Sequence, residues 1–474
     1  MEMLLGGEWR AATNGATEVV RSPYDDRPVG SVPVATIDDA AAAVDYAEAA
    51  ARVQRETPAH ERVTVLLRAA DLADQRAEDI AQTISAETGK PISEARGEAS
   101  RSGAIIRLAA HEGSQLYGST LPLDANPGTG LEKIGFTLRQ PCGIVVAITP
   151  FNYPALLVLH KIAPALAAGN AVVLKPARST PLTALKLAEC FVDAGLAPGA
   201  LSVLTGSGAT LGDRLVTDPR VRKVSFTGST ATGTHLAAVA GIKKLSLELG
   251  ASCPVLPDAD IDMAASAVAA GGYINAGQVC ISVQRVIVDE RVEADFLDAL
   301  VPKVDAITLG DPAREDTRLG SLISETEATR VHSAIQAAGQ SGAKLLTGGD
   351  RDGAVITPAV VAVVDPQSPF SRDELFGPAV AVSSAPDIAA AIAIANDSEY
   401  GLGAGIFTSD VAATVRAMRQ IDAGNIHINW TPLWRADLMP YGGLKGSGIG
   451  KEGVRSAVHE MTEEKTIVIH GRPW

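Results

Sequence analysis

The chain has 474 residues, which suggests two or three domains at roughly 100–200 residues per domain. Hydrophobic residues make up 46% and charged residues 20%, so the chain can build a sizeable core and global disorder is excluded. The 41 basic and 55 acidic residues give a net charge of −14, which argues against nucleic acid or an anionic membrane as the main partner.

Cysteine usage and the apolar segments indicate the compartment. Four cysteines in so long a chain cannot form a disulfide framework, so we expect a reducing, cytoplasmic location. The N-terminal segment has no basic start and no long apolar stretch, and no secretory signal is predicted. The longest uncharged run, between Arg139 and Lys161, is broken by Pro141, Pro150 and Pro154. We interpret it as a buried strand, a turn and the start of a helix rather than a membrane span.

The first third of the chain is predicted to be mainly helical. Three helices are expected, over about 36–55, 58–89 and 92–115. Residues 121–140 then alternate loosely and contain Gly and Pro, as an extended arm would. Near the C-terminus, 466–470 (TIVIH) alternates like an edge strand.

From Gly143 onward, short apolar runs alternate with helical segments. Strands are predicted at 143–148, 171–175, 201–204 and 223–226. A second series of the same kind begins after Gly250. Such alternation indicates βαβ units and a parallel sheet, so we predict an α/β fold.

Glycine-rich segments suggest where a phosphate could bind. Residues 206–212 follow a strand and open a helix, but the third glycine comes one residue later than in G-x-G-x-x-G. Residues 226–229 (FTGS) close a strand and open a helix, whose N-terminal N–H groups favour an anion. The glycines at 446, 448 and 450 follow no strand and are interpreted as a structural turn.

Three residues have groups suited to covalent chemistry, although each alone would more often be structural. Cys280 follows an amphipathic helix and has no apolar reason to be buried, unlike Cys142 and Cys190. Glu248 ends a strand, and open α/β sheets bind ligands at such carboxyl ends. Asn152 is held between two prolines and could donate a hydrogen bond. We predict no metal site.

Seven motifs occur in order along the chain: PFNYP, LKPA, FTGS, LELG, GQVC, ELFGP and PYGGLKGSG. Together they resemble the aldehyde dehydrogenase superfamily, and the resemblance extends over essentially the whole chain. It implies a Rossmann-like cofactor domain (1–118 and 139–247), a catalytic α/β domain (248–455) and a small β oligomerisation arm (119–138 and 456–474). An arm with free edges implies a homodimer or homotetramer.

The resemblance also assigns catalytic roles. Cys280 would attack the aldehyde carbon, and Asn152 would hold the oxyanion together with the Cys280 backbone N–H. After hydride transfer to the nicotinamide, Glu248 would activate the water that hydrolyses the thioester. The implied activity is oxidation of an aldehyde to its carboxylate with NAD or NADP.

Cofactor contacts are implied at further positions. Lys175 would contact the adenosine ribose, Ser229 the pyrophosphate, and Glu374 with Phe376 the nicotinamide ribose and ring. The remaining expected contacts are Ile148, Arg178, Gly208, Phe226 and Gly228. Many NAD-using relatives have a glutamate where this chain has Arg178, and a guanidinium suits a 2′-phosphate. NADP is therefore favoured over NAD, unless Arg178 is simply a solvated surface arginine.

The substrate pocket is implied at Arg107, Tyr153, His160, Trp434 and Arg435. Arg107 and His160 together would make it partly cationic and able to bind an anionic group. We therefore predict a small polar, anionic aldehyde, resembling phosphonoacetaldehyde, sulfolactaldehyde or a semialdehyde. If Arg107 faces solvent and His160 is a core residue, lactaldehyde or glyceraldehyde fits better.

Two competing hypotheses concern the activity itself. A CoA-acylating semialdehyde dehydrogenase is disfavoured by Glu248, because such relatives typically lack this base. A catalytically silent protein on the same scaffold is disfavoured by the joint presence of Cys280, Glu248 and Asn152.

Overall fold

The computed structural model describes residues 1–257 and 260–471. Its largest sheet has eight strands in the order β2-β1-β9-β8-β7-β10-β11-β21. These strands are β1 (Met3–Leu5), β2 (Glu8–Arg10), β7 (Ile144–Ile148), β8 (Ala171–Lys175), β9 (Leu201–Val203), β10 (Val221–Thr227), β11 (Lys244–Glu248) and β21 (Gly448–Ile449). β7 and β8 are buried at every position and rich in β-branched residues, which is typical of central parallel strands.

Helices surround this sheet. They are α1 (Ile37–Glu56), α2 (Ala59–Gln75), α3 (Ala77–Thr88), α4 (Ile92–Ala99), α5 (Ser102–Gly113), α6 (Leu156–Ala167), α7 (Pro181–Asp193), α8 (Gly208–Thr217), α9 (Thr230–Ala240) and α16 (Val454–Glu460). α1 and α8 pack against each other and against the sheet, whereas α6 packs against the same strands and contacts α2 and α5. α6 is buried along its whole length, so it fixes the loop that precedes it.

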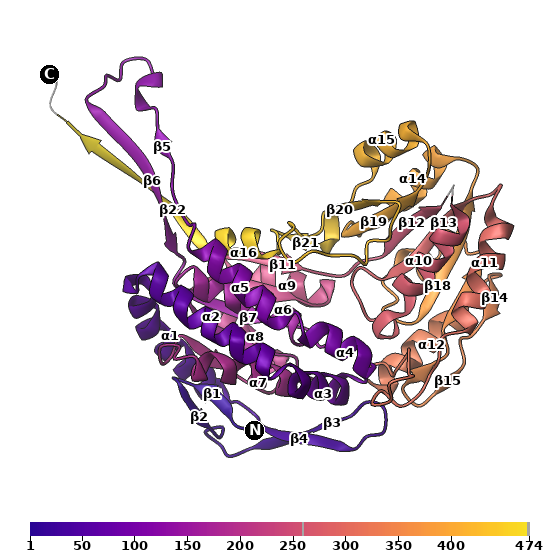
Figure 1. Ribbon diagram of the computed structural model, residues 1–474, viewed down its shortest axis with the longest axis horizontal. Coiled ribbons are helices and arrows are strands. Elements are labelled where there is room, and N and C mark those ends of the chain that lie inside the picture. The colour runs from indigo at the N-terminus through magenta and orange to yellow at the C-terminus, as the bar shows by residue number, and fades with distance from the viewer. Residues whose placement is uncertain (258–259, 472–474) are drawn as a thin grey trace.

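A second sheet of seven strands forms the other lobe (Figure 1), in the order β14-β17-β18-β13-β12-β19-β20. Its strands are β12 (Cys253–Pro257), β13 (Val283–Asp289), β14 (Lys344–Thr347), β17 (Ala359–Ala362), β18 (Ala379–Ala385), β19 (Gly403–Phe407) and β20 (Asn425–Ile428). The helices of this lobe are α10 (Ile261–Tyr273), α11 (Glu293–Asp305), α12 (Glu325–Gln340), α13 (Pro369–Arg372), α14 (Ile388–Asn396) and α15 (Val411–Gln420). The predicted α/β fold is confirmed.

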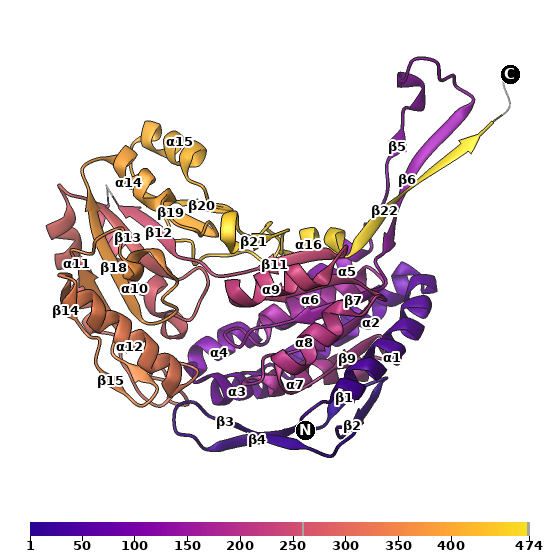
Figure 2. The same cartoon turned by 180° about the vertical axis from the view of Figure 1, so that it is seen from behind.

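A three-stranded antiparallel sheet projects from the body (Figures 1 and 2). It consists of β5 (Thr120–Leu121), β6 (Lys133–Pro141) and β22 (Thr462–His470), with β22 pairing along the whole of β6. Most of the two segments predicted as an arm therefore forms this sheet, but 456–460 belong to α16, and 472–474 lie outside the described residues. The predicted domain boundaries stay predictions.

One local element was missed, and two local expectations were wrong. The N-terminal hairpin β3 (Thr17–Arg21) and β4 (Pro28–Pro33) was not predicted, because its strands are polar and largely exposed. The predicted helices at 58–89 and 92–115 each break, at Arg76 and at residues 100–101. The glycines near 448 do not form a simple turn, because Gly448 pairs with Glu248 as part of β21. A Cβ at Gly448 would lie 2.0 Å from the Leu247 carbonyl oxygen, so this contact requires glycine.

Among the described residues, no helix is long and apolar enough to cross a membrane.

Candidate active site

Asn152, Glu248 and Cys280, far apart in the sequence, line one cavity of about 320 Å³. Asn152 lies in the loop after β7 and Glu248 is the last residue of β11, so both stand at carboxyl ends of parallel strands. Cys280 lies in the loop that leads from the 3₁₀ turn η2 (Ile274–Gly277) into β13 of the other sheet. The cavity therefore lies where the two sheets meet, which suits a ligand site.

The loop before Cys280 is held in an unusual backbone conformation. Asn275 and Ala276 have φ values of 50° and 52°, in the left-handed region that non-glycine residues rarely adopt. The side-chain amide of Asn152 donates to the Gln278 carbonyl (2.9 Å), and the Asn275 amide donates to the Asn152 carbonyl (3.1 Å). An amide nitrogen carries two N–H groups, and the bond to Gln278 uses one of them, so the geometry is compatible with the expected second bond to an oxyanion.

Buried charges hold the Asn152 loop from the other side. Lys90 Nζ donates to the Asn152 carbonyl (2.9 Å) and to Glu98 (2.5 Å). Glu98 in turn accepts from the backbone N–H groups of Ala155 (2.9 Å) and Leu156 (3.2 Å) at the start of α6. A carboxylate at a helix N-terminus is stabilised by the helix dipole, so this network makes the loop rigid.

Tyr441 contacts the cysteine directly, although the sequence interpretation did not single it out. Its hydroxyl lies 3.1 Å from Cys280 Sγ, and the Arg435 guanidinium lies 3.9 Å from its ring centroid. Burial raises the pKa of Tyr441 well above its usual value, so the hydroxyl stays protonated and can donate to a thiolate. Tyr441 belongs to the PYGG motif, but that motif indicated only the family resemblance and no role for the tyrosine.

Glu248 is fully buried beside a second carboxylate, Glu452. No partner is present for either Glu248 oxygen within the part of the chain that the structure describes. Burial and the charge of Glu452 raise the pKa of Glu248. Although burial opposes it, the charges of Lys161 and Arg435 hold the pKa of Glu452 below its usual range, and Lys161 Nζ lies 2.5 Å from Glu452. The sequence interpretation missed both Glu452 and Lys161.

The 441–452 segment connects these two halves of the site. Tyr441 and Glu452 pair through their backbones, with N···O distances of 2.9 Å and 2.6 Å. One closed loop thus places a phenol at Cys280 and a carboxylate near Glu248.

Most of the expected cofactor residues lie at or just after the carboxyl ends of β7, β8, β9 and β10. Ser229 caps α9 by accepting from the Thr232 backbone N–H (3.4 Å), and Gly228 stands where a Cβ would meet the Phe226 ring at 2.6 Å. Ile148 ends β7, Lys175 ends β8, and Gly208 opens α8. A row of strand ends with a helix N-terminus fits a dinucleotide phosphate, so these residues fit NAD or NADP.

Glu374 and Phe376 line the same cavity as Cys280. Glu374 accepts from the Ala251 N–H (3.0 Å), and burial raises its pKa to about 7. Phe376 has a φ of 52° and packs edge-to-face on Phe151 with ring centroids 6.0 Å apart. The strained backbone at Phe376 fixes an aromatic wall beside the thiol, where a flat nicotinamide ring would fit.

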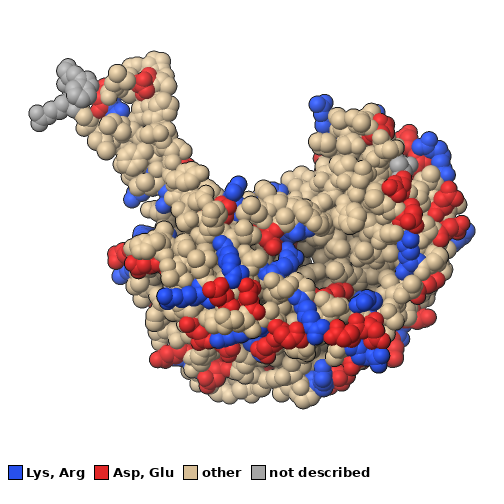
Figure 3. Space-filling model, in the orientation of Figure 1, with Lys and Arg blue, Asp and Glu red and all other residues tan. Residues whose placement is uncertain are grey.

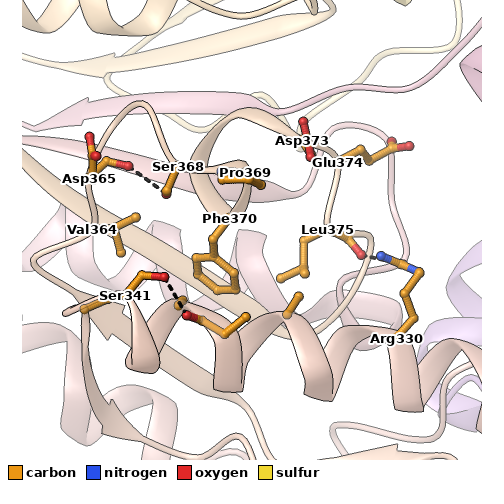
Figure 4. A pocket seen from close by; sticks show the side chains of 14 residues that line it. Arg330, Ser341, Val364, Asp365, Ser368, Pro369, Phe370, Asp373, Glu374 and Leu375 are labelled. Carbon is orange, nitrogen blue, oxygen red and sulfur yellow. Dashed lines mark hydrogen bonds between the residues drawn. The ribbon is translucent and has the colours of Figure 1, made fainter.

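A second cavity of about 270 Å³ lies behind the Glu374 loop, between α12 and α13 (Figure 4). Arg330 on α12 donates to the Leu375 carbonyl (2.7 Å), as the dashed line in Figure 4 marks. Helix α12 therefore holds the Glu374 loop from behind.

Arg178 is not a free cation. Its Nε lies 2.6 Å from Oε2 of Glu18 on β3, an acid that the sequence interpretation did not consider. No sequence signal marks this pair, because 160 residues separate its members.

The prediction for Arg107 is wrong. Arg107 pairs with Asp71 and Asp74 of α2, each at 2.6 Å, and does not line the Cys280 cavity. The break before α5 changes the helical phase assumed from a continuous helix, and Arg101 at the break pairs with Asp437 instead. Acidic and basic side chains lie next to each other over α2 and α5 (Figure 3).

The other expected substrate residues differ in their surroundings. Tyr153 is partly buried with Lys90 Nζ 3.8 Å from its ring centroid, and Trp434 is exposed. His160 Nε2 lies 3.2 Å from Asp437, and burial together with the Arg435 charge lowers the pKa of His160. Burial therefore disfavours the charged form of His160, which argues against its adding positive charge to the pocket. Arg435 is the buried cation of this group.

Taken together, a thiol, an amide donor and a buried carboxylate beside a dinucleotide-type sheet suit an oxidoreductase that attacks its substrate through sulfur. The sequence matches the aldehyde dehydrogenase family over residues 9–467. It is 42% identical to a 3-sulfolactaldehyde dehydrogenase of Priestia aryabhattai over 470 residues, covering 99% of this chain and 98% of that protein. It is 37% identical to a lactaldehyde dehydrogenase of Methanococcus vannielii, covering 95% and 97%.

Solved structures agree with these relatives. The NADP-dependent glyceraldehyde-3-phosphate dehydrogenase of Bacillus halodurans C-125, complexed with NADP, superposes with a TM-score of 0.97 at 35% identity and 99% coverage of both chains. The chain belongs to the aldehyde dehydrogenase family. It is an NAD(P)-dependent enzyme that oxidises a small aldehyde.

Replacing the thiol tests the nucleophile. Cys280→Ala is expected to lower kcat by a factor on the order of 10³ or more while leaving NAD(P) binding intact, because no thioester can form. Steady-state rates and equilibrium cofactor binding check this. Cys142→Ala, at a buried thiol outside the cavity, is the matched control and should retain activity. Comparable activity in both variants would remove Cys280 from the mechanism.

The pH profile tests Glu248. A base acts when deprotonated, and the pKa of Glu248 is raised, so thioester hydrolysis should accelerate from about pH 6 to about pH 9. Glu248→Gln should give a burst of reduced cofactor followed by slow turnover, and the rise with pH should disappear. Rapid-mixing absorbance across that range measures both. A pH profile that is the same in Glu248→Gln would assign the titration to another group.

Proposed function

We propose that the substrate is a small anionic aldehyde of the phosphonoacetaldehyde, sulfolactaldehyde or semialdehyde kind. The observation behind this is Arg435, whose side chain is only 11% exposed. Its Nε and Nη2 make no hydrogen bond to any residue that the structure describes, and the nearest carboxylate oxygen, on Glu452, lies 3.6 Å from Nη2. Buried guanidinium N–H groups without acceptors favour an anionic ligand.

The position of Arg435 suits an anion attached near the aldehyde. Its guanidinium stacks on the ring of Tyr441, whose hydroxyl contacts Cys280. An aldehyde carbon at the sulfur would place a substituent a few bonds away near Arg435. Lys161 already neutralises Glu452, so the charge of Arg435 remains for a substrate.

The names of two similar proteins agree with this proposal. The Priestia aryabhattai relative is a sulfolactaldehyde enzyme, and the Bacillus halodurans structure is a glyceraldehyde-3-phosphate enzyme. A second candidate is a lactaldehyde-type enzyme, which the Methanococcus vannielii relative and the exposed position of Arg107 favour.

The chemistry that we propose begins at Cys280. Its thiolate forms a bond to the aldehyde carbon, and the resulting oxyanion accepts hydrogen bonds from Asn152 and from the Cys280 backbone N–H. NAD(P), when bound, supplies the hydride acceptor. The thioester left on Cys280 is attacked by a water that gives its proton to Glu248, the carbon–sulfur bond breaks, and a carboxylate is released. Because Glu248 is present, hydrolysis rather than transfer to CoA is proposed.

For the cofactor site, we propose the contacts at Lys175, Arg178, Ser229, Glu374 and Phe376 described above. We also propose a cytoplasmic location, on the basis of the unpaired thiols Cys142 and Cys190.

Removing the buried guanidinium tests the substrate class. Arg435→Gln is expected to raise KM for succinic semialdehyde by about 10–100-fold, the value of a lost charge-assisted hydrogen bond, and to change KM for propanal little. Arg107→Gln, at a surface arginine, is the matched control. Equal losses on both aldehydes would favour the lactaldehyde-type candidate.

We further propose a homodimer or homotetramer formed through the arm. Apolar side chains are exposed along β6 and β22, with Ile134 at 60% and Ile469 at 52%, and few charged side chains cover the arm in Figure 3. Such a surface on a sheet with free edges favours burial against another copy.

Introducing charged side chains into the arm tests whether the arm forms the subunit interface. Ile134→Glu with Ile469→Glu should shift the chain to monomer, because two carboxylates would be buried in the interface. Light scattering after size exclusion gives the mass. Val53→Glu, at an equally exposed position on α1, should leave the mass unchanged, and an unchanged mass in the arm variant would place the interface elsewhere.

A further inference from the structure

The N-terminal hairpin β3–β4 lies against the strand ends that form the adenosine side of the proposed cofactor site. The Ala35 backbone N–H donates to the Thr205 carbonyl just after β9 (3.0 Å), and the Thr205 hydroxyl donates to the Pro33 carbonyl. A Cβ at Gly30 of β4 would lie 3.1 Å from Leu182 of α7. These contacts hold the hairpin in place, and the ion pair between Glu18 and Arg178 brings β3 to the segment that follows the carboxyl end of β8.

Glu18 stands beside both residues expected to bind the ribose. Its Oε2 accepts from Arg178 Nε at 2.6 Å. Glu18 is also close enough to Lys175 that its charge acts on the lysine, although burial dominates and lowers the pKa of Lys175 to about 8. Lys175 Nζ itself donates to the Pro176 carbonyl (2.6 Å) rather than to Glu18.

The two members of the ion pair differ in exposure. The Glu18 side chain is 15% exposed and the Arg178 side chain 68%. The second carboxylate oxygen, Oε1, is buried and has no hydrogen-bond partner in residues 1–257 and 260–471. A buried acceptor without a donor is unfavourable, so Oε1 is suited to a hydroxyl supplied by a ligand.

We propose that Glu18 is the acidic ribose partner that position 178 lacks, and that the Glu18–Arg178 pair sets the choice between NAD and NADP. This rests on the proposed cofactor site. With NAD, the 2′-hydroxyl donates to Glu18 while Arg178 holds the carboxylate in place. With NADP, Arg178 must leave Glu18 to bind the 2′-phosphate, and the carboxylate repels that phosphate. A prediction based on Arg178 alone therefore overestimates the preference for NADP.

Equilibrium binding of NAD and NADP without aldehyde tests the proposal by calorimetry. Glu18→Gln should tighten NADP about tenfold, because repulsion is removed and Arg178 is released, and should weaken NAD severalfold. Arg178→Gln should weaken NADP about tenfold and change NAD little. In the double variant, the gain in NADP affinity from Glu18→Gln should be smaller than in the parent, because the released guanidinium is absent.

Controls separate this from a general effect on charge or folding. Glu8→Gln removes a more exposed carboxylate that pairs with Arg10 at the same distance (2.6 Å) on β2, and its NAD/NADP affinity ratio should equal that of the parent. The affinities for 2′,5′-ADP and for ADP measure the contacts on the adenosine side of the cofactor site alone. If Glu18→Gln is unstable to heating, Glu18→Asp keeps the charge but shortens its reach, and should weaken NAD without tightening NADP.

The proposal would be overturned if the NAD/NADP affinity ratio of Glu18→Gln lay within twofold of the ratio of Glu8→Gln. Failure of the proposed function would look different, because neither cofactor would bind the parent, or anionic aldehydes would not be oxidised although both cofactors bind.

Discussion

The hydrogen bond from the Asn152 amide to the Gln278 carbonyl joins two loops that belong to different sheets. Cys280 lies two residues beyond Gln278, so this bond fixes the distance between the thiol and the amide that is proposed to hold the oxyanion. Lys90 and Asn275 both donate to the Asn152 carbonyl, which ties the same residue to the turn between α3 and α4 and to η2. Preorganised donors need no rearrangement when charge develops, so the geometry of the chemistry depends on this junction.

Buried carboxylates in this molecule fall into two kinds. Glu98 and Glu87 are satisfied, the first by Lys90 and the α6 N–H groups and the second by the N–H groups of Leu182 and Thr183. Glu248 and Glu18, and Glu452 at Oε2, instead each bury an oxygen that finds no hydrogen-bond donor in the described parts of the chain. An unsatisfied buried acceptor costs about 1–3 kcal/mol, so it persists where a ligand or water completes it. The same reasoning therefore indicates ligand contacts at Glu248, where the thioester would be hydrolysed, and at Glu18, where the ribose would bind.

Much of the fold was predictable because its signals are local. The strands β7 and β8 are continuous apolar runs, and the arm strands alternate as edge strands do. The predictions failed where they depended on the rotational phase of a helix or on contacts between segments far apart in the sequence. Arg107 could be placed only by knowing that the helix breaks before α5, and Glu18 only by knowing that a polar hairpin packs on β9. Motif order led to the three proposed catalytic residues, but it gave no role to Tyr441 and did not mark Glu452 or Lys161, whose place at the site depends on how the 441–452 segment closes onto α6.

The contrast between Arg107 and Arg435 shows why burial, not charge, identifies a recognition residue. Arg107 has two aspartate partners on the surface, where an ion pair contributes about 0–1 kcal/mol and is screened by salt. Arg435 is buried, stacked on the tyrosine that contacts Cys280, and within ion-pair range of a carboxylate that already has a lysine. Desolvating a guanidinium without completing its hydrogen bonds is unfavourable in the substrate-free protein. An anionic substrate group would recover that free energy on binding, which makes Arg435 the residue through which charge selectivity would be established.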